Sequence, residues 1–408
     1  MNLNIHILKH LIVTATVVGG FLPMTLSAQN ISQIAQSDPL IITGAIGTQN
    51  TYRYTGGNSY SSSPWSNMIY ANLNISVYGI AMPFSLYYSN DNTSFSYPQI
   101  SFNLTPSYGP WTGHVGLSSM PFSSYVMNMS YNGVGLEYNT NKIRAGAFYG
   151  KLRSAINSDP TDPYARTPQY KRMGWGFKAG YGTGRNYIDV YLLRAYDEPN
   201  SIDESWRRII RPQENIVVGL RGCVTPLPWL SLSTNAAVSA FSSDTEVAEV
   251  ETPVADRWSK IFNTRYSSNA HVAGDVNANI HLGSVNASVS YRYIQPDYVS
   301  LGTTYISNNY HSLGLNLSTQ LFHQVSLTAN FSGQEDNLSG KQLYTTRGLV
   351  YALNASSRIG NHFSIAAGFN GYTQTQRNGT AVVNDTTRVD RLVRSFSITP
   401  TYKQKELH

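Results

Sequence analysis

The feature that most constrains this chain is an alternation of apolar and polar residues that recurs along most of its length. Residues 72–77, 312–318 and 325–332 alternate without a fault. Residues 271–282 place mainly apolar side chains at even positions and mainly histidine, aspartate and asparagine at odd positions. Because successive side chains of a β-strand point to opposite faces, each segment has one apolar face and one polar face. The chain is therefore predicted to be all-β.

The connections between these segments alternate in length. Tight connections are expected near residues 81–83, 108–110, 139–141, 182–184, 226–228, 283–284, 322–323 and 360–361. Longer polar connections are expected around residues 55–65, 157–170, 199–213, 242–269, 333–343 and 374–389. This layout is typical of a transmembrane up-and-down antiparallel β-barrel. The tight turns imply about sixteen strands, and additional strands near 39–54 and 390–404 bring the number to about eighteen.

The composition favours a membrane barrel over a soluble β-sandwich, which also alternates. Charged residues make up only 13% of the chain, roughly half the usual share. The mean hydropathy is −0.26, so uncharged polar residues supply the polarity. A Ser, Asn and Gly face suits a confined lumen, and 29 tyrosines suit aromatic girdles at the membrane interfaces. The net charge of +6 is dispersed, which gives nucleic-acid binding little support.

The N-terminal residues predict export. A short polar start carrying Lys9 precedes an apolar run from Leu11 to Leu26, and a small residue, Ala28, stands before Gln29. This is the pattern of a cleaved signal peptide, whereas a membrane-anchoring helix needs about 20 strongly apolar residues. We therefore divide the chain into a signal peptide (1–28), a short periplasmic segment (29–38) and an outer-membrane barrel (39–408).

Several short sequence segments resemble those of a known family. They are residues 132–138 with 142–150, 170–176, 187–189, 291–298 and 334–338. The chain resembles an uncharacterised family of outer-membrane β-barrels from Bacteroidota over most of its mature length. The resemblance implies a barrel and an outer membrane, and it supplies no substrate and no functional residues. One departure is the end at Leu407-His408, because many barrels finish on an aromatic residue; the last strand is expected to end near Tyr402.

Several charged residues alternate with apolar neighbours and are expected to face inward. With two uncharged residues, they form the set predicted to line the lumen: Arg144, Lys178, Asp189, Arg221, Asp275, His281, Arg292 and Asn316. Charged rings in a lumen set ion preference, which would give a mild anion preference. In the alternative interpretation, which we favour, these charges pair across strands and brace the barrel.

No motif predicts catalysis, and no catalytic residue, cofactor or metal site is expected. Nucleophile, phosphate-loop and zinc-helix motifs do not occur. Asp275 and His281 share one face of a strand but lie about 20 Å apart at the strand rise. Acids in residues 158–164 and 242–269 match no calcium-loop spacing, so solvated acidic loops are favoured over a metal site.

The pattern therefore predicts a passive, porin-like channel or a channel-like accessory subunit in the outer membrane. The alternative is a closed structural or docking barrel that anchors a secretion, adhesion or envelope-assembly partner. A rim-active enzyme is a weaker alternative. Expected partners are outer-membrane lipid, the barrel-assembly machinery and an envelope protein bound through the loops at 199–213 and 242–269. An open lumen would favour the channel, and a filled lumen would favour docking.

Overall fold

The computed structural model describes residues 39–52, 65–90, 100–157, 167–250, 262–322, 324–360, 362–383 and 388–403. Within them nineteen strands form one antiparallel sheet, and helical structure is confined to η1 (Pro199–Ser201) and α3 (Glu204–Arg207). None of the helices described is long and apolar enough to cross a membrane. The expected signal peptide, the segment 29–38 and the C-terminal residues 404–408 lie outside the described residues.

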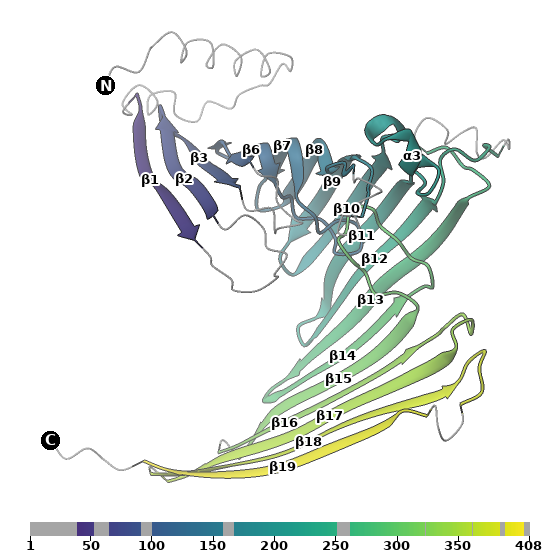
Figure 1. Ribbon diagram of the computed structural model, residues 1–408. Helices are drawn as coiled ribbons and strands as arrows, with labels where there is room; N and C mark the ends of the chain where they lie inside the picture. Colours follow the sequence, from purple (N-terminus) through teal and green to yellow (C-terminus); the bar gives the residue numbers. More distant parts are fainter. Residues whose placement is uncertain are drawn as a thin grey trace.

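The strands follow one another in chain order as an up-and-down series (Figure 1). They are β1 (Ile41–Tyr52), β2 (Trp65–Val77), β3 (Ile80–Ser89), β4 (Ile100–Leu104), β5 (Ser107–Tyr108), β6 (Trp111–Ser118), β7 (Tyr131–Asn139), β8 (Ile143–Arg153), β9 (Arg172–Thr183), β10 (Asn186–Asp197), β11 (Glu214–Leu227), β12 (Leu230–Ser242), β13 (Ser268–Leu282), β14 (Val285–Ile294), β15 (Tyr310–Leu321), β16 (Val325–Asp336), β17 (Tyr344–Ile359), β18 (Phe363–Asn378) and β19 (Asp390–Tyr402).

Strands β4 and β5 are two parts of one strand. Both pair with β3 on one side and with β6 on the other, and they are separated only by Thr105 and Pro106. Pro106 has no N–H to donate to the ladder, which explains the interruption. Counting the two parts as one leaves 18 strand positions from the 19 strands. The structure therefore confirms the all-β, antiparallel, up-and-down fold at the upper end of the predicted strand number.

The predicted tight turns occur at the expected places with one correction, and residues 323 and 361 of two of these turns lie outside the described residues. The turn assigned to residues 81–83 lies instead at Tyr78 and Gly79, and residues 81–83 belong to β3. Tyr78 has φ 48° and Gly79 has φ 81°, which are the left-handed values that a two-residue hairpin turn requires. The sequence prediction gave Pro83 too much weight, because a proline also fits inside a strand where the pairing is irregular. The carbonyl of Pro83 accepts a hydrogen bond from the Thr105 N–H at 2.9 Å.

The two faces of the sheet have opposite character, as the alternation predicted. One face carries large apolar side chains that remain exposed, such as Val276, Leu315 and Ile398. We call it the outer face. The opposite face carries serine, threonine, asparagine and charged residues over much of its area, and two connections fold against it. We call this the inner face.

The first and last strands form the two ends of the curved sheet in Figure 1. Among the described residues, β1 pairs with β2 and β19 pairs with β18, and no pairing joins β1 to β19. β1 starts beside the turn after β2, and β19 ends beside the turn before β18. The two end strands therefore run in opposite directions, as an additional antiparallel pairing between them requires.

We predict that β1 and β19 pair to close the barrel, because unpaired strand edges are not tolerated in a bilayer. Thr43 lies on the inner face, and so do the odd-numbered residues of β19. In a Cys223→Ser background, Thr43→Cys should form a disulfide with cysteine at one odd-numbered position of β19. Cysteines at even-numbered positions serve as controls, because their Cβ vectors point to the other face. Equal cross-linking at odd and even positions, or none at any position of the folded protein, would contradict closure.

Candidate functional site

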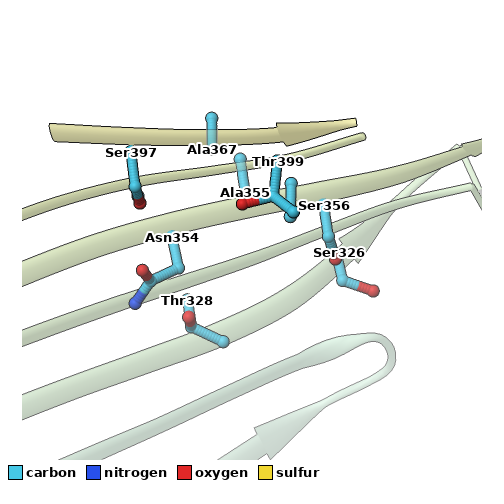
Figure 2. Close-up of a pocket in the computed structure, with 10 residues that line it drawn as sticks. Ser326, Thr328, Asn354, Ala355, Ser356, Ala367, Ser397 and Thr399 are labelled. Atoms are coloured by element: carbon cyan, nitrogen blue, oxygen red, sulfur yellow. The ribbon is translucent and has the colours of Figure 1, made fainter. Parts of the chain in front are cut away.

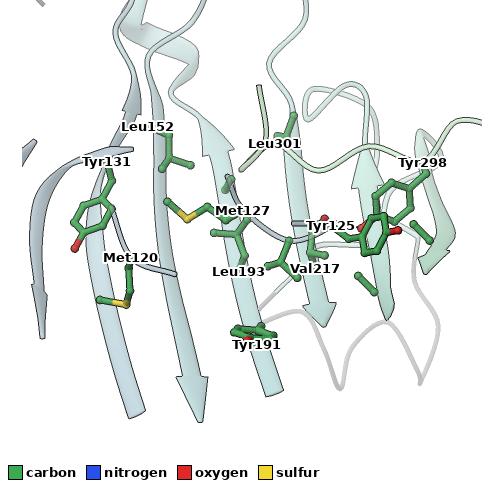
Figure 3. Close-up of a cluster of buried hydrophobic side chains, with 14 of the residues drawn as sticks. Met120, Tyr125, Met127, Tyr131, Leu152, Tyr191, Leu193, Val217, Tyr298 and Leu301 are labelled. Atoms are coloured by element: carbon green, nitrogen blue, oxygen red, sulfur yellow. Dashed lines mark hydrogen bonds between the residues drawn. The ribbon is translucent and has the colours of Figure 1, made fainter. Parts of the chain in front are cut away.

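Two connections cover part of the inner face. The first inward loop (119–130) joins β6 to β7, and the second inward loop (295–309) joins β14 to β15. Their buried side chains pack with inner-face residues of β7, β8 and β10–β14 in one apolar cluster (Figure 3). Neither segment is among the long connections that were predicted from the sequence. The structure therefore adds a feature that the sequence interpretation missed.

An apolar area of the inner face receives these loops. Leu193 on β10 and Val217 on β11 are fully buried beneath them, and Ile294 on β14 is 3% exposed. Glycine allows the close approach, because a Cβ on Gly219 would lie 2.4 Å from Val126 Cγ2. These apolar residues occupy inner-face positions that would otherwise be polar. That break in the alternation was the signal from which the docking area could have been found.

Hydrogen bonds join the two loops to each other. The Tyr298 hydroxyl donates to the Tyr125 carbonyl at 2.8 Å, and the Ser300 hydroxyl donates to the Val126 carbonyl at 2.6 Å. The backbone N–H of Asn128 donates to the carbonyl of Gly302 at 3.1 Å. The loops therefore form one unit rather than two independent flaps.

Further hydrogen bonds fix this unit to the wall. The Tyr125 hydroxyl donates to Asp275 at 2.7 Å, and the Ser123 hydroxyl donates to Asn235 at 2.6 Å. Burial raises the pKa of Tyr125, and the hydrogen bond to Asp275 raises it further; burial also raises the pKa of Tyr298. Both hydroxyls therefore keep their protons at neutral pH and remain donors.

The structure places all eight residues that were predicted to line the lumen on the inner face. Five of them stand in one cross-strand row, interrupted only by Gly180 and Asn235. In order from β8 to β14, the row reads Arg144, Gly180, Asp189, Arg221, Asn235, Asp275 and Arg292. Lys178, His281 and Asn316 belong to other rows. The first inward loop contacts this charged row through Asn235 and Asp275.

Some of these charges form ion pairs and others do not. Arg144 binds Asp189 at 2.7 Å, and Lys178 binds Glu137, which also contacts His114 at 2.9 Å. Neither Arg221 nor Arg292 forms an ion pair with any residue that the structure describes. The Arg221 guanidinium lies over the ring of Tyr187, with its Cζ 5.8 Å from the ring centroid. Both arginines remain exposed on the inner face.

Glycine makes room for the two ion pairs to span an intervening strand. Arg144 on β8 and Asp189 on β10 meet across Gly180 of β9, where a Cβ would lie 1.9 Å from Asp189 Oδ1. Glu137 on β7 and Lys178 on β9 meet in the same way across Gly146 of β8. A Cβ on Gly146 would lie 2.9 Å from the Lys178 Cε. Each pair therefore links strands that are not direct neighbours.

The inner face of β15–β19 differs from this braced region. Small uncharged side chains line a shallow groove there, as Figure 2 shows for Ser326, Thr328, Asn354, Ser397 and Thr399. Of the described residues in these strands, only Tyr310 at the start of β15 packs against the cluster of the inward loops. The inner surface thus has one covered and charged part and one open part with mainly uncharged side chains.

At the end of the sheet that carries the long connections, Arg211 joins two loops by contacting Glu246 at 2.5 Å and Asp244 at 3.6 Å. Within the connection between β12 and β13, Arg265 contacts Glu249 at 3.2 Å. The acids weighed earlier as a solvated loop or a metal site therefore have arginine partners where they are described. Among the described residues, no group of three His, Cys, Asp or Glu side chains is placed to hold a metal ion.

No protein-family model matches the chain, and no curated protein matches it in sequence. Solved structures from Pseudomonas aeruginosa are similar to it. OpdQ has 10% identity and a TM-score of 0.41 over 88% of this chain and 98% of OpdQ. OccK2 (OpdF) in complex with glucuronate has 10% identity and a TM-score of 0.42 over 89% and 97%. The outer membrane protein OprD has 9% identity and a TM-score of 0.40 over 89% and 93%. These values are low, so the fold rests on the strand pairing described above.

We predict that Gly180→Ala destabilises the folded protein by about 1–3 kcal/mol, because the added methyl displaces the Asp189 carboxylate from Arg144. Gly348→Ala is the matched control. Gly348 also lies on the inner face, and a Cβ there meets nothing within 4 Å. Denaturant unfolding in detergent, followed by tryptophan fluorescence, measures both variants. Equal stability of the two variants would show that the bridged ion pair contributes nothing.

Proposed function

We propose that the protein is a passive, non-catalytic channel of the outer membrane, through which small solutes diffuse past the two inward loops. The main support for the proposal is that the two faces of the sheet differ in polarity. The sheet has 18 strands when β4 and β5 are counted as one. The outer face is apolar and exposed, and the inner face is polar with an open part. A closed sheet of this kind separates lipid from water.

The outer face favours lipid as its surroundings. Val276 is 54% exposed and Ile398 is 56% exposed, and similar apolar side chains continue across the strands between them. Soluble monomers rarely expose apolar patches of more than a few hundred Å², so such a face in water would promote aggregation. Aromatic residues also stand near both ends of the outer face. Tyr149 lies toward the loop end of β8, and Tyr181 lies toward the turn end of β9, as interfacial girdles require.

The predicted signal peptide supports the same location. A chain exported across the inner membrane and closed as a barrel of even strand number fits the outer membrane, because closure pairs every edge. We also propose that the chain is related to the outer-membrane β-barrel family from Bacteroidota, because of the short sequence segments that resemble that family.

The inner face favours a channel over a closed barrel. Barrels of about sixteen to eighteen strands are wide enough to enclose an aqueous path. The two inward loops narrow that path from one side only, since their cluster packs on β7, β8, β10–β14 and the first residue of β15. Arg221 and Arg292 stand exposed at the margin of the loops, where a passing ion would meet them.

A docking barrel is the second candidate, and one observation favours it. The contacts of Arg211 with Asp244 and Glu246 join the connection after β10 to the connection after β12. A braced platform of this kind is suited to hold a protein partner. The channel experiment below separates the two candidates, because a docking barrel does not need to conduct.

We predict that the purified, folded protein forms stable conductance steps in planar lipid bilayers. Replacing residues 121–129 by a short Gly-Ser linker should raise the conductance, because it removes one of the two loops that narrow the path. Heat-modifiable migration on gels verifies that each protein is folded. Absence of conductance from folded wild-type protein would reject the channel and favour docking. Unchanged conductance of the folded linker variant would show that the loop does not narrow the path.

We predict that Leu315→Arg impairs folding in a bilayer far more than Asn316→Arg. The two residues are adjacent on β15 but point to opposite faces. Arginine at the middle of a lipid-facing strand costs about 2–4 kcal/mol, whereas an arginine in a wet lumen stays hydrated. Folding yield into lipid vesicles measures the difference. Equal damage from both substitutions would mean that the two faces have similar surroundings.

A further inference from the structure

Seven asparagines stand together on the inner face of β13–β18, and we call them the asparagine wall. They are Asn277, Asn279, Asn286, Asn316, Asn330, Asn354 and Asn370. One cross-strand row alone runs from Asn279 through Ser288 to Asn316, Asn330, Ala352 and Asn370. Serine and threonine fill most positions between them, and Figure 2 shows Asn354 among such residues.

Most of these amides have no partner in the protein. The Asn277 amide donates to Asp275 at 3.0 Å, and the Asn316 amide donates to Ser288 at 3.1 Å. The other five side chains make no hydrogen bond to any residue that the structure describes. Asn286, Asn330 and Asn370 are also exposed. The amides therefore do not hold the sheet together, and their hydrogen-bonding groups are available to water or to a solute.

In the covered part of the inner face, by contrast, the asparagine side chains do have partners. On β11 and β12 the inner-face amides of Asn215 and Asn235 are engaged with serine side chains or with the inward loops. The asparagine wall begins where these loops end. A solute that passes beside the loops must therefore move along the wall.

Charged side chains are sparse around the asparagine wall. From Arg292 on β14, the charged row continues through the uncharged residues Ser312, Gln334, Gly348 and Gln374 and reaches Arg391 on β19. On the inner face of β17 and β19, Arg358 and Arg391 stand near opposite ends of the strands. Primary amides and hydroxyls both donate and accept hydrogen bonds. Such a surface attracts neither anions nor cations by net charge, but it matches the hydroxyl groups of a sugar.

We infer that the asparagine wall is the solute-contacting surface of the channel and that its preferred solutes are neutral polyhydroxylated molecules, that is, carbohydrates. The inference rests on the proposed channel function and adds the substrate class. Strands lie about 4.8 Å apart, and same-face residues on one strand lie about 6.6 Å apart. This spacing offers a solute several weak contacts at once. Contacts that are weak and repeated favour passage over trapping.

The experiment uses the full-length mature protein in planar bilayers, with maltotriose as the probe. Maltotriose should interrupt the ion current in a concentration-dependent manner, whereas trigalacturonate, an anion of similar size, should do so less. Asn330→Leu combined with Asn354→Leu removes two amides while keeping the number and branching of the side-chain heavy atoms. The double variant should lose at least about fivefold in apparent maltotriose affinity, as expected for two neutral hydrogen bonds, and its own ion current without sugar is the reference for that measurement.

Asn132→Leu is the matched control, because Asn132 lies on β7 and its side chain is on the outer face. It should leave the maltotriose affinity unchanged. Conductance without interruption by maltotriose, or stronger interruption by trigalacturonate, would overturn the carbohydrate inference and leave the channel intact. An unchanged affinity in the double variant would overturn the role of the wall. Absence of any conductance would instead reject the channel itself.

Discussion

Pairing of every backbone N–H and C=O along the strands is the constraint on which the rest of this structure depends. In a bilayer no water is available to satisfy an unpaired group, so a spanning sheet must be a continuous ladder of hairpins. The alternation of side chains follows from that ladder, because each strand then has one face toward lipid and one toward the interior. The unequal connections follow as well. Tight turns keep neighbouring strands in register, and longer loops are free to fold inward or outward.

Within this frame, two kinds of interaction stabilise one side of the inner face. Ion pairs reach over Gly146 and Gly180 and link strands that do not pair directly. The inward loops add a buried apolar cluster of the kind found in soluble domains. Truncating a buried leucine of such a cluster costs about 2–5 kcal/mol. The covered side therefore carries stabilisation that the open side lacks.

Local patterns were sufficient to predict much of this fold. The alternation in residues 312–332 identified which residues of β15 and β16 face inward, because the period of two depends only on the strand itself. The turn near 81–83 was misplaced, since a proline signals a turn or an irregular strand equally well. Docking of the inward loops was missed because Leu193 and Val217 meet Val126 only in three dimensions. The pairing of Arg144 with Asp189 needs the register of three strands, which one sequence does not specify.

The unpaired asparagines have a consequence for how such a protein changes over generations. A side chain that supports no neighbour can be exchanged at little cost to folding, whereas Gly180 or Asp189 cannot. The open side of the inner face is therefore free to diversify. Substitutions at these positions of β15–β18 leave the ion pairs and the loop cluster of the covered side intact.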